Sequence, residues 1–439
     1  MRKKILFFSS WPKSHLYPLK SLISYLKKKN FEIYILTIES NKEIVENFLN
    51  SKFIEYPFNI NQIYNENYIK SKVKKSKEYF LKKEYKKSYV EFLKSDISIV
   101  LNYRKRDLNK LMNIVETIRP NYIFRDAVDI YAHDISNEKK IPCIGYITNN
   151  LYSKKFFEKN PKYLYKIFMA GINYECFLGE DFFSNFYSLE CKLYDEVSKE
   201  LNTKMIRPFH QFDPNENTNI IFSTDFLQPS YSLYDNKRYD IIYPSLEQFS
   251  IENEINHRLS SFIKRNNDKK KVYISTGSFI NMDFTYYKTL LEILIKEKYY
   301  IILSVRNQKK DIINYFDEYS DMIYIDDFIE QKYVLNYCDL FITSGGFNSI
   351  LESIYYKVPM LVIPVSSEQR LNALIIENLK LGKNCYSYEN INKDLTQLIH
   401  TLECEKSIKE SLEKYSQCIE KKSKKNNFKN LERLLKWIF

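Results

Sequence analysis

Glycine is scarce in this sequence, which holds only 7 glycines among 439 residues. An average composition would supply about 30 in a chain of this length. Two of the seven nevertheless stand side by side, as Gly345 and Gly346 in the stretch TSGGFNSILE. A glycine pair kept against such a bias predicts a place where a side chain would obstruct the backbone or a ligand.

Long apolar runs are lacking as well. No stretch approaches the ~20 residues that a membrane-spanning helix needs, and the longest dense run, PMLVIPV, has the length of a strand. The N-terminal stretch MRKKILFFSSW places basic residues before an apolar run, as a signal peptide does. That run is short, however, and Trp11-Pro12-Lys13 follows where small residues should mark cleavage. We therefore expect a buried first strand here.

Cysteine and histidine patterns argue against disulfides and zinc. The seven cysteines are odd in number and scattered, none forms a CxxC pair, and the five histidines do not cluster with them. No Asp-x-Asp stretch occupies a position suited to a metal-bound donor either. We expect a cytoplasmic protein with no metal and no cofactor.

The chain carries a net charge of +12, which raises the question of a nucleic-acid or membrane partner. Its lysines are spread along the whole length and are densest at residues 70–87 and 420–436. Neither stretch matches a nucleic-acid-binding motif, so we interpret them as solvated helix faces and expect no nucleic-acid partner. An anionic substrate or a contact with a membrane surface stays open, and so does the oligomeric state, including a homodimer.

Strand-like apolar runs alternate with helical patterns in two series, which predicts parallel, doubly wound sheets in an α/β protein of two domains. The first series has strand-like runs at residues 3–10, 31–38, 121–127 and 141–148. The second has them at residues 269–278, 300–305, 322–328, 339–343 and 359–365. Helices are expected within residues 60–118, at 129–140 and at 185–202, inside an aromatic-rich stretch, and in the C-terminal tail.

The glycine pair lies where the run DLFIT gives way to the helical pattern SILESIYY. Glycine there permits a positive φ and a close approach by a ligand. Asn348 or Ser349 is suited to cap the helix, and free amides at a helix start form an anion site, most often for phosphate. The alternative is a merely tight turn.

The flanking sequences add specificity. Upstream lies DDFIEQKYVLNYC and downstream VPMLVIPVSSEQRLNA. In this order they resemble the donor-binding signature of the family 1, UDP-glycosyltransferase-like nucleotide-sugar glycosyltransferases, in particular the bacterial macrolide-type branch. The resemblance implies the glycosyltransferase B fold, in which two doubly wound Rossmann-like domains face a cleft. It is strong over residues 270–380 and moderate over 1–40 and 119–147.

The resemblance implies a role for each matched residue. Phe328 stacks on the nucleobase, Glu352 binds the ribose hydroxyls, and Glu368-Gln369 holds the hydroxyls of the donor sugar. The complete donor-binding set that it implies is Gly277, Ser278, Phe328, Ile329, Gln331, Ser344, Gly345, Gly346, Asn348, Ser349, Glu352, Glu368 and Gln369. For Glu352 the alternative is a solvated helix carboxylate.

Two positions depart from the family pattern. Ser344 stands where the family has a histidine, and Glu330 where it has a proline. Losing the histidine removes a donor to the pyrophosphate, so that amides, hydroxyls or a cation must stabilise the leaving group. Arg306 is a candidate substitute, with a surface arginine as the equal alternative.

The N-terminal region supplies a candidate acid–base pair. The family places its base as a histidine shortly before a proline after the first strand, which matches His15 and Pro18. Asp126 ends a later strand and matches the carboxylate that orients the base. A histidine is suited to take a proton from an alcohol near neutral pH. Asp129, as a helix cap, and His133, within a predicted helix, are the competing residues.

The expected function follows from this resemblance. Many retaining enzymes of this fold use a glutamate eight residues before the one matching Glu352, and that position is Ser344, which favours inversion. We expect an N-terminal acceptor-binding domain at residues 1–245, a nucleotide-sugar-binding domain at 246–415, and a C-terminal helix at 416–439 that returns to the first domain. The expected reaction moves a sugar from a UDP- or dTDP-sugar to a hydroxyl of a small, hydrophobic or natural-product acceptor.

Two alternatives remain open for the function. One is a transferase that forms glycolipids at a membrane surface, with the tail LERLLKWIF as an anchor. The other is an inactive donor-binding partner protein. The replacement of the family's histidine by Ser344 is the main support for this alternative. The aromatic residues at 150–210 fit either an acceptor pocket or ordinary core packing.

Overall fold

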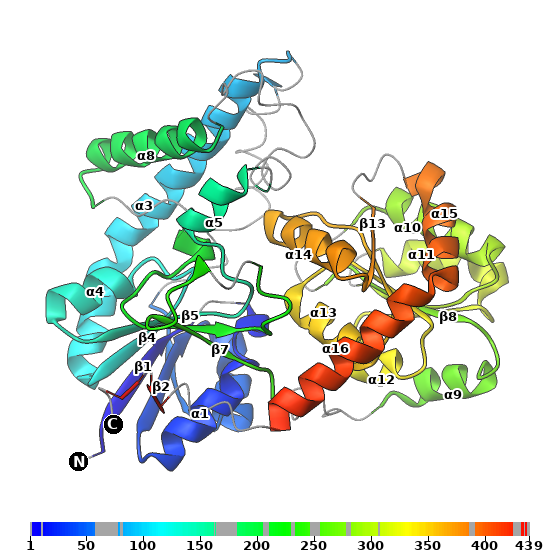
Figure 1. Cartoon of the computed structure of the whole chain (residues 1–439), viewed down its shortest axis with the longest axis horizontal. Helices are drawn as coiled ribbons and strands as arrows, with labels where there is room; N and C mark the ends of the chain where they lie inside the picture. Colours follow the sequence, from blue (N-terminus) through cyan, green and yellow to red (C-terminus); the bar gives the residue numbers. More distant parts are fainter. Residues whose placement is uncertain are drawn as a thin grey trace. The chain divides into compact units, whose positions relative to one another are not determined.

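The computed structural model describes the chain at residues 2–9, 12–57, 78–79, 82–161, 163, 182–204, 210–229, 233–245, 255–277, 282–305, 308–385, 391–424, 432–433 and 435–436. The chain divides into two compact units (Figure 1). Unit 1 consists of Met1–Tyr165, Met169–Pro244 and Asn426–Phe439, and unit 2 of Lys166–Phe168 and Ser245–Lys425. The boundary between the two units at residues 244/245 lies between the two series of strand-like runs.

Unit 1 is built on a seven-stranded sheet of order β3-β2-β1-β4-β5-β6-β7, and every pairing in it is parallel. Its strands are β1 (Lys4–Phe8), β2 (Glu32–Thr37), β3 (Lys52–Glu55), β4 (Tyr122–Asp126), β5 (Cys143–Ile147), β6 (Asn219–Phe222) and β7 (Tyr239–Ile242). All five residues of β4 are buried. Such two-sided burial is expected of parallel sheets, whose crossover helices cover both faces.

Helices of unit 1 cover this sheet and extend from it (Figure 1). They are α1 (Leu19–Lys28), α3 (Tyr85–Ile118), α4 (Ala132–Lys139), α5 (Lys154–Lys159) and α8 (Phe182–Glu200). In α1 the buried residues are Leu19, Leu22, Ile23 and Leu26. This i, i+3, i+4, i+7 spacing forms one apolar stripe, and that stripe joins the core cluster that contains Ile5 and Phe7 of β1.

Unit 2 is built on a six-stranded parallel sheet of order β10-β9-β8-β11-β12-β13. Its strands are β8 (Lys271–Ser275), β9 (Tyr300–Ser304), β10 (Ile323–Asp326), β11 (Leu340–Thr343), β12 (Met360–Val362) and β13 (Gly382–Asn384). Its helices are α9 (His257–Arg265), α10 (Phe284–Lys296), α11 (Lys309–Tyr315), α12 (Gln331–Leu335), α13 (Phe347–Tyr355), α14 (Ser367–Asn378), α15 (Ile391–Cys404) and α16 (Lys406–Lys424).

Each sheet reverses its strand order at one point. In unit 1 the chain builds outward from β1 through β2 to β3 and then starts again on the other side with β4. In unit 2 the same reversal separates β8 from β11. Ligands of open α/β sheets bind at the carboxyl ends of the strands beside such a switch point, so the segments that follow these four strands are where a site is expected.

The predicted fold class is confirmed, since both units are parallel sheets flanked by helices. The expected strand-like runs appear as strands, and the helix expected near 185–202 is α8. Sequence reasoning missed β3, β7 and β13, whose short segments KFIE, YDII and GKN each carry charged or polar residues. The expected helices within 60–118 appear as α3, while residues 58–77 lie outside the described part of the chain.

The C-terminal segment is shared between the units. The expected boundary at 415/416 falls inside α16, where the Ser416 hydroxyl donates to the Tyr355 carbonyl of unit 2 at 2.8 Å. Beyond α16, the Tyr25 hydroxyl of α1 donates to the Glu432 carboxylate at 2.6 Å. Leu435 is fully buried in the core of unit 1. Within the described ranges, no helix is long and apolar enough to cross a membrane.

Gly382 provides a stability prediction. A Cβ on Gly382 would collide with the Met360 carbonyl of the paired strand β12, so we expect Gly382→Ala to lower the free energy of unfolding by about 1–3 kcal/mol, as overpacking does. Gly346→Ala is the matched control: its Cβ meets nothing within 4 Å, and we expect only the smaller loss of about 0.5–1 kcal/mol that a poorer helix N-cap causes. Urea unfolding of both variants measures this, and an equal loss in the two would contradict it.

Candidate functional site

His15 and Asp126 meet at the switch point of the first sheet. β1 and β4 are neighbours, with Phe8 opposite Arg125, and after β1 the chain turns through a short 3-10 helix, η1 (Lys13–His15). The His15 Nδ1 lies 2.6 Å from the Asp126 Oδ2, although 111 residues separate them. Asp126 ends β4, and its side chain is fully buried, whereas that of His15 is 20% exposed.

The contact defines what the imidazole can do. The second Asp126 oxygen, Oδ1, accepts from the Val128 amide at 3.2 Å, so the carboxylate is fixed from two sides. Because Nδ1 is held by the carboxylate, Nε2 is the ring nitrogen that can take a proton from a hydroxyl. A buried carboxylate at this distance stabilises the imidazolium that such a transfer produces.

The two competing residues have other contacts. The Asp129 Oδ1 accepts from the amides of Tyr131 and Ala132, at 3.0 and 2.7 Å, at the start of α4. Burial raises the pKa of Asp129 to about 6. His133 is the second residue of α4, and its Nδ1 lies 2.8 Å from Glu216. Asp129 therefore holds the amides at the start of α4, and His133 contacts Glu216 beside this helix.

The glycine pair lies at the switch point of the second sheet, between β11 and α13. Gly345 has a φ of +86°, and a Cβ on it would lie 2.7 Å from the Val362 Cγ1. The fold therefore requires glycine at 345. Gly346 has a φ of −62° and open space where a Cβ would stand. Neither backbone conformation nor packing requires glycine at 346, although glycine is among the residues favoured at a helix N-cap. The open space beside its α-carbon leaves room for a group that approaches the helix start.

The capping prediction for α13 is wrong. The helix begins at Phe347 with Gly346 as its N-cap, and no side chain caps it. Asn348 and Ser349 instead lie in the first turn. The expected start of a helix directly after the glycine pair is present, and its N-cap residue is a glycine, which has no side chain to cap the helix. A helix N-terminus of this kind favours an anion.

Gln331, Ser349 and Glu352 form a connected group. The Gln331 Nε2 donates to the Ser349 Oγ at 3.1 Å and to the Glu352 Oε2 at 2.6 Å. Burial raises the pKa of Glu352 from 4.5 to about 7, with the neighbouring Glu330 adding to the rise and Lys332 opposing it. Glu352 is half-buried and hydrogen-bonded to Gln331, so the interpretation as an ordinary solvated carboxylate does not hold.

Phe328 lies three residues before Gln331 and is the most exposed large apolar side chain among the described residues, at 68%. The next residue, Ile329, is 5% exposed and packs inward. An aromatic ring left in solvent beside a buried neighbour has a face on which another planar group can stack.

Gln369 makes contacts that sequence reasoning missed. Its Oε1 accepts from the amides of Val365 and Ser366, at 3.0 and 3.1 Å, and its amide forms a capping box with Ser366 at the start of α14. Its Nε2 donates to the Ser344 Oγ at 3.2 Å. The signal was present in the sequence as Ser366-x-x-Gln369, the spacing of a capping box.

The remaining candidates are placed as follows. Gly277 follows β8 with a φ of +81°, and Glu368 is the second residue of α14. Ser278 and Arg306 lie outside the described residues. Among the described aromatic residues of the 150–210 stretch, Tyr152, Phe156 and Phe157 pack on one another and are at most 1% exposed, as core residues are. Tyr163, Tyr187 and Tyr194 are half-buried.

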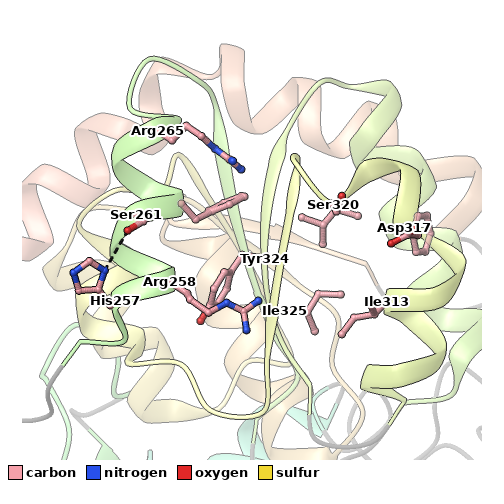
Figure 2. A pocket seen from close by; sticks show the side chains of 12 residues that line it. His257, Arg258, Ser261, Arg265, Ile313, Asp317, Ser320, Tyr324 and Ile325 are labelled. Atoms are coloured by element: carbon pink, nitrogen blue, oxygen red, sulfur yellow. Dashed lines mark hydrogen bonds between the residues drawn. The ribbon is translucent and has the colours of Figure 1, made fainter.

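A cavity of about 510 Å³ lies elsewhere in unit 2. It lies between α9 and α11 along the edge strand β10, with Arg258 and Tyr324 on one side and Ile313 on the other (Figure 2). None of the candidate donor-binding residues lines it.

Comparison with known proteins gives a consistent result. Residues 262–433 match the glycosyltransferase family 28 C-terminal domain. The chain is 33% identical over 135 residues to UDP-glycosyltransferase UGT4 of Dactylopius coccus, covering 30% of this chain and 25% of that protein. It is 25% identical over 275 residues to NDP-glycosyltransferase YjiC of Bacillus subtilis (strain 168), covering 63% of this chain and 62% of that one. The alignments thus span a quarter to about three fifths of these relatives.

Two solved structures share the fold over almost the whole chain. The glycotransferase of kitacinnamycin matches with a TM-score of 0.68 at 17% identity, covering 99% of both chains. The spinosyn rhamnosyltransferase SpnG complexed with thymidine diphosphate matches with a TM-score of 0.59 at 12% identity, covering 95% of this chain and 96% of that one. At these identities the likeness establishes the arrangement of the backbone.

The raised pKa of Glu352 predicts a pH dependence of stability. Unfolding returns the pKa from about 7 to 4.5, so between these values the folded protein binds the proton more tightly, and the free energy of unfolding falls as pH rises. Glu352→Gln keeps an acceptor for Gln331 and removes the charge. We expect the variant to gain stability over the wild type progressively from pH 4.5 to 7, with no further gain above. Urea unfolding across pH measures it, and a constant difference would contradict it.

Proposed function

We propose that this chain is an inverting, metal-independent glycosyltransferase of the UDP-glycosyltransferase family, which its matches to glycosyltransferases support. It moves a sugar from a nucleotide-sugar, either a UDP- or a dTDP-sugar, to a hydroxyl of a small hydrophobic acceptor. The single observation that carries the proposal is the 2.6 Å contact between His15 and Asp126 at the switch point of unit 1.

The proposed reaction assigns proton transfer to unit 1. The His15 Nε2 takes the proton of the acceptor hydroxyl as its oxygen bonds to the anomeric carbon, and the bond from that carbon to the nucleotide phosphate breaks. Asp126 stabilises the imidazolium, which then releases its proton to solvent. Attack opposite the leaving group inverts the anomeric configuration. A general base of this kind contributes typically 10²–10⁴-fold to the rate.

The proposed donor site belongs to unit 2. The uncapped amides at Gly346 and the first turn of α13 receive the diphosphate, whose negative charge the helix N-terminus favours. Phe328 stacks on the base, and Glu352 accepts hydrogen bonds from the ribose hydroxyls. Glu368 and Gln369, at the start of α14, are assigned to the donor sugar. Here Glu352 must be ionised to act as an acceptor only, so donor binding is strongest above its pKa of about 7.

The choice of substrates is supported by the relatives' names. The two structures that share the fold are described as a glycotransferase of kitacinnamycin and a spinosyn rhamnosyltransferase, the latter bound to thymidine diphosphate. Another structure of that rhamnosyltransferase is complexed with spinosyn aglycone, which supports a small natural-product acceptor, and thymidine diphosphate supports a nucleoside diphosphate as leaving group. The proposed site of action of the enzyme is the cytoplasm.

The two alternative functions are less well supported. Leu435 of the tail is fully buried in the core of unit 1 and Glu432 binds Tyr25, so these tail residues have a packing role that needs no membrane. An inactive binding protein has no use for a buried carboxylate held 2.6 Å from a partly exposed imidazole. These contacts favour the enzyme over both alternatives.

The base is tested by His15→Ala. We expect the turnover of a nucleotide-sugar, with an acceptor or by hydrolysis, to fall by about 10²–10⁴-fold, because the acceptor oxygen keeps its proton in the transition state. Binding of UDP or dTDP, followed by thermal shift, should stay unchanged, because the substitution lies in unit 1.

His133→Ala is the matched control, since that histidine contacts Glu216 and not Asp126, and we expect it to keep most of the activity. Turnover of His15→Ala at the wild-type rate would remove His15 from the mechanism. Proton NMR of the product distinguishes an inverted from a retained anomeric configuration, and undiminished activity in EDTA is expected of a metal-independent enzyme.

A further inference from the structure

Ser344 connects three segments at the switch point of the second sheet. Its hydroxyl donates to the Thr276 carbonyl, at the end of β8, at 3.0 Å. It accepts from the Gln369 Nε2, at the start of α14, at 3.2 Å. Ser344 itself begins the glycine loop after β11. Ser344 and Thr276 are 4% and 8% exposed, so both bonds are shielded from water.

The hydrogen-bonding capacity of these groups is almost used up. A serine hydroxyl has one proton, and that of Ser344 is directed to the Thr276 carbonyl. The Gln369 Oε1 already accepts from two backbone amides. Of the two side chains, only one amide proton of Gln369 is left for a ligand, and the Ser344 hydroxyl has no further proton to give to a phosphate.

The same segments hold Gly277 and Gly345, the two glycines of positive φ among the described residues. Gly277 follows Thr276 directly, and Gly345 follows Ser344. The Gly345 carbonyl accepts from the Asn372 Nδ2 of α14 at 3.0 Å, and the space beside its α-carbon is filled by Val362. The first turns of α14 therefore hold the loop on one side, while Ser344 ties it to the end of β8.

From this geometry we infer that Ser344 is a positioning residue for the donor diphosphate and does not itself donate to it. Through Thr276 and Gln369, Ser344 fixes the backbone at Gly277 and the backbone at Gly345-Gly346 relative to each other, so that their amides are arranged before a ligand arrives. This inference rests on the proposed function. It reassigns the position at which the family carries a pyrophosphate donor, and it leaves recognition of the diphosphate to backbone amides.

Preorganisation of this kind has a distinct signature. Backbone that is already ordered loses less entropy when it binds a ligand, and in the proposed donor site only the diphosphate lies against both Gly277 and Gly345-Gly346. Base and ribose are assigned to Phe328 and Glu352, which Ser344 does not touch. Loss of the Ser344 hydroxyl should therefore lower the affinity for UDP and leave the affinity for uridine unchanged.

The experiment measures dissociation constants of UDP and uridine, and of dTDP and thymidine, by calorimetry on the full chain. We expect Ser344→Ala to weaken the nucleoside diphosphate roughly three- to tenfold, the equivalent of one net hydrogen bond, and to change the nucleoside less than about twofold. Ser344→Cys fills the same space with a weaker donor and should give an intermediate loss, so it decides the question should the alanine variant fail to fold.

Ser353→Ala is the matched control. The Ser353 hydroxyl is also buried and donates to a backbone carbonyl, that of Val358, at 2.6 Å, but away from the glycine loop. It should lower stability and leave the ratio of UDP to uridine affinity unchanged. An unchanged ratio in the Ser344 variants would overturn the inference. A wild type that binds neither UDP nor dTDP would instead overturn the proposed function.

Discussion

The left-handed backbone of Gly345 is the constraint on which the second unit's site depends. Val362 occupies the space that a side chain would need, and Asn372 holds the carbonyl. The chain can therefore turn from β11 into α13 only in this conformation, and the turn exposes the uncapped start of the helix at Gly346. The second glycine has no such structural reason, which makes it the better indicator of a ligand. Because glycine is scarce elsewhere in the chain, a glycine without a structural reason is more noticeable here than in an average sequence.

A comparable constraint operates in the first unit. Parallel pairing of β1 with β4 brings the segments after both strands to one edge of the sheet, and that edge is where His15 and Asp126 make contact. The carboxylate is buried and fixed by the Val128 amide, while part of the imidazole reaches solvent. A buried orienting group with a partly exposed base suits proton transfer to a substrate that arrives from outside.

Much of this could be predicted from the sequence, and the failures have identifiable causes. Short apolar runs such as KKILFFSS correctly predicted strands, because burial on both faces of a parallel sheet demands them. β13 was not predicted, because its three residues, GKN, show neither an apolar run nor an alternation of apolar and polar residues. The position of the glycine loop followed from its neighbours, but the cap of α13 did not, because Asn348 and Ser349 enter the first turn of the helix instead.

Side-chain networks were the least predictable part. The burial of Glu352 and its contact with Gln331 depend on how α12 packs on α13, and no local pattern encodes that packing. The link from Gln369 through Ser344 to Thr276 joins residues 93 positions apart at its extremes, 276 to 369. Only the fold brings these residues together. The capping box of Ser366 and Gln369, in contrast, could have been predicted from their spacing in the sequence.

The central claim is that a nucleoside diphosphate rests on the backbone at Gly346 and the start of α13. A crystal structure of the protein with bound UDP or dTDP tests it most directly. The account predicts diphosphate oxygens within hydrogen-bonding distance of these amides, with the base against the ring of Phe328. A nucleotide bound in the cavity along β10, or anywhere else that leaves the glycine loop without contact, would contradict it.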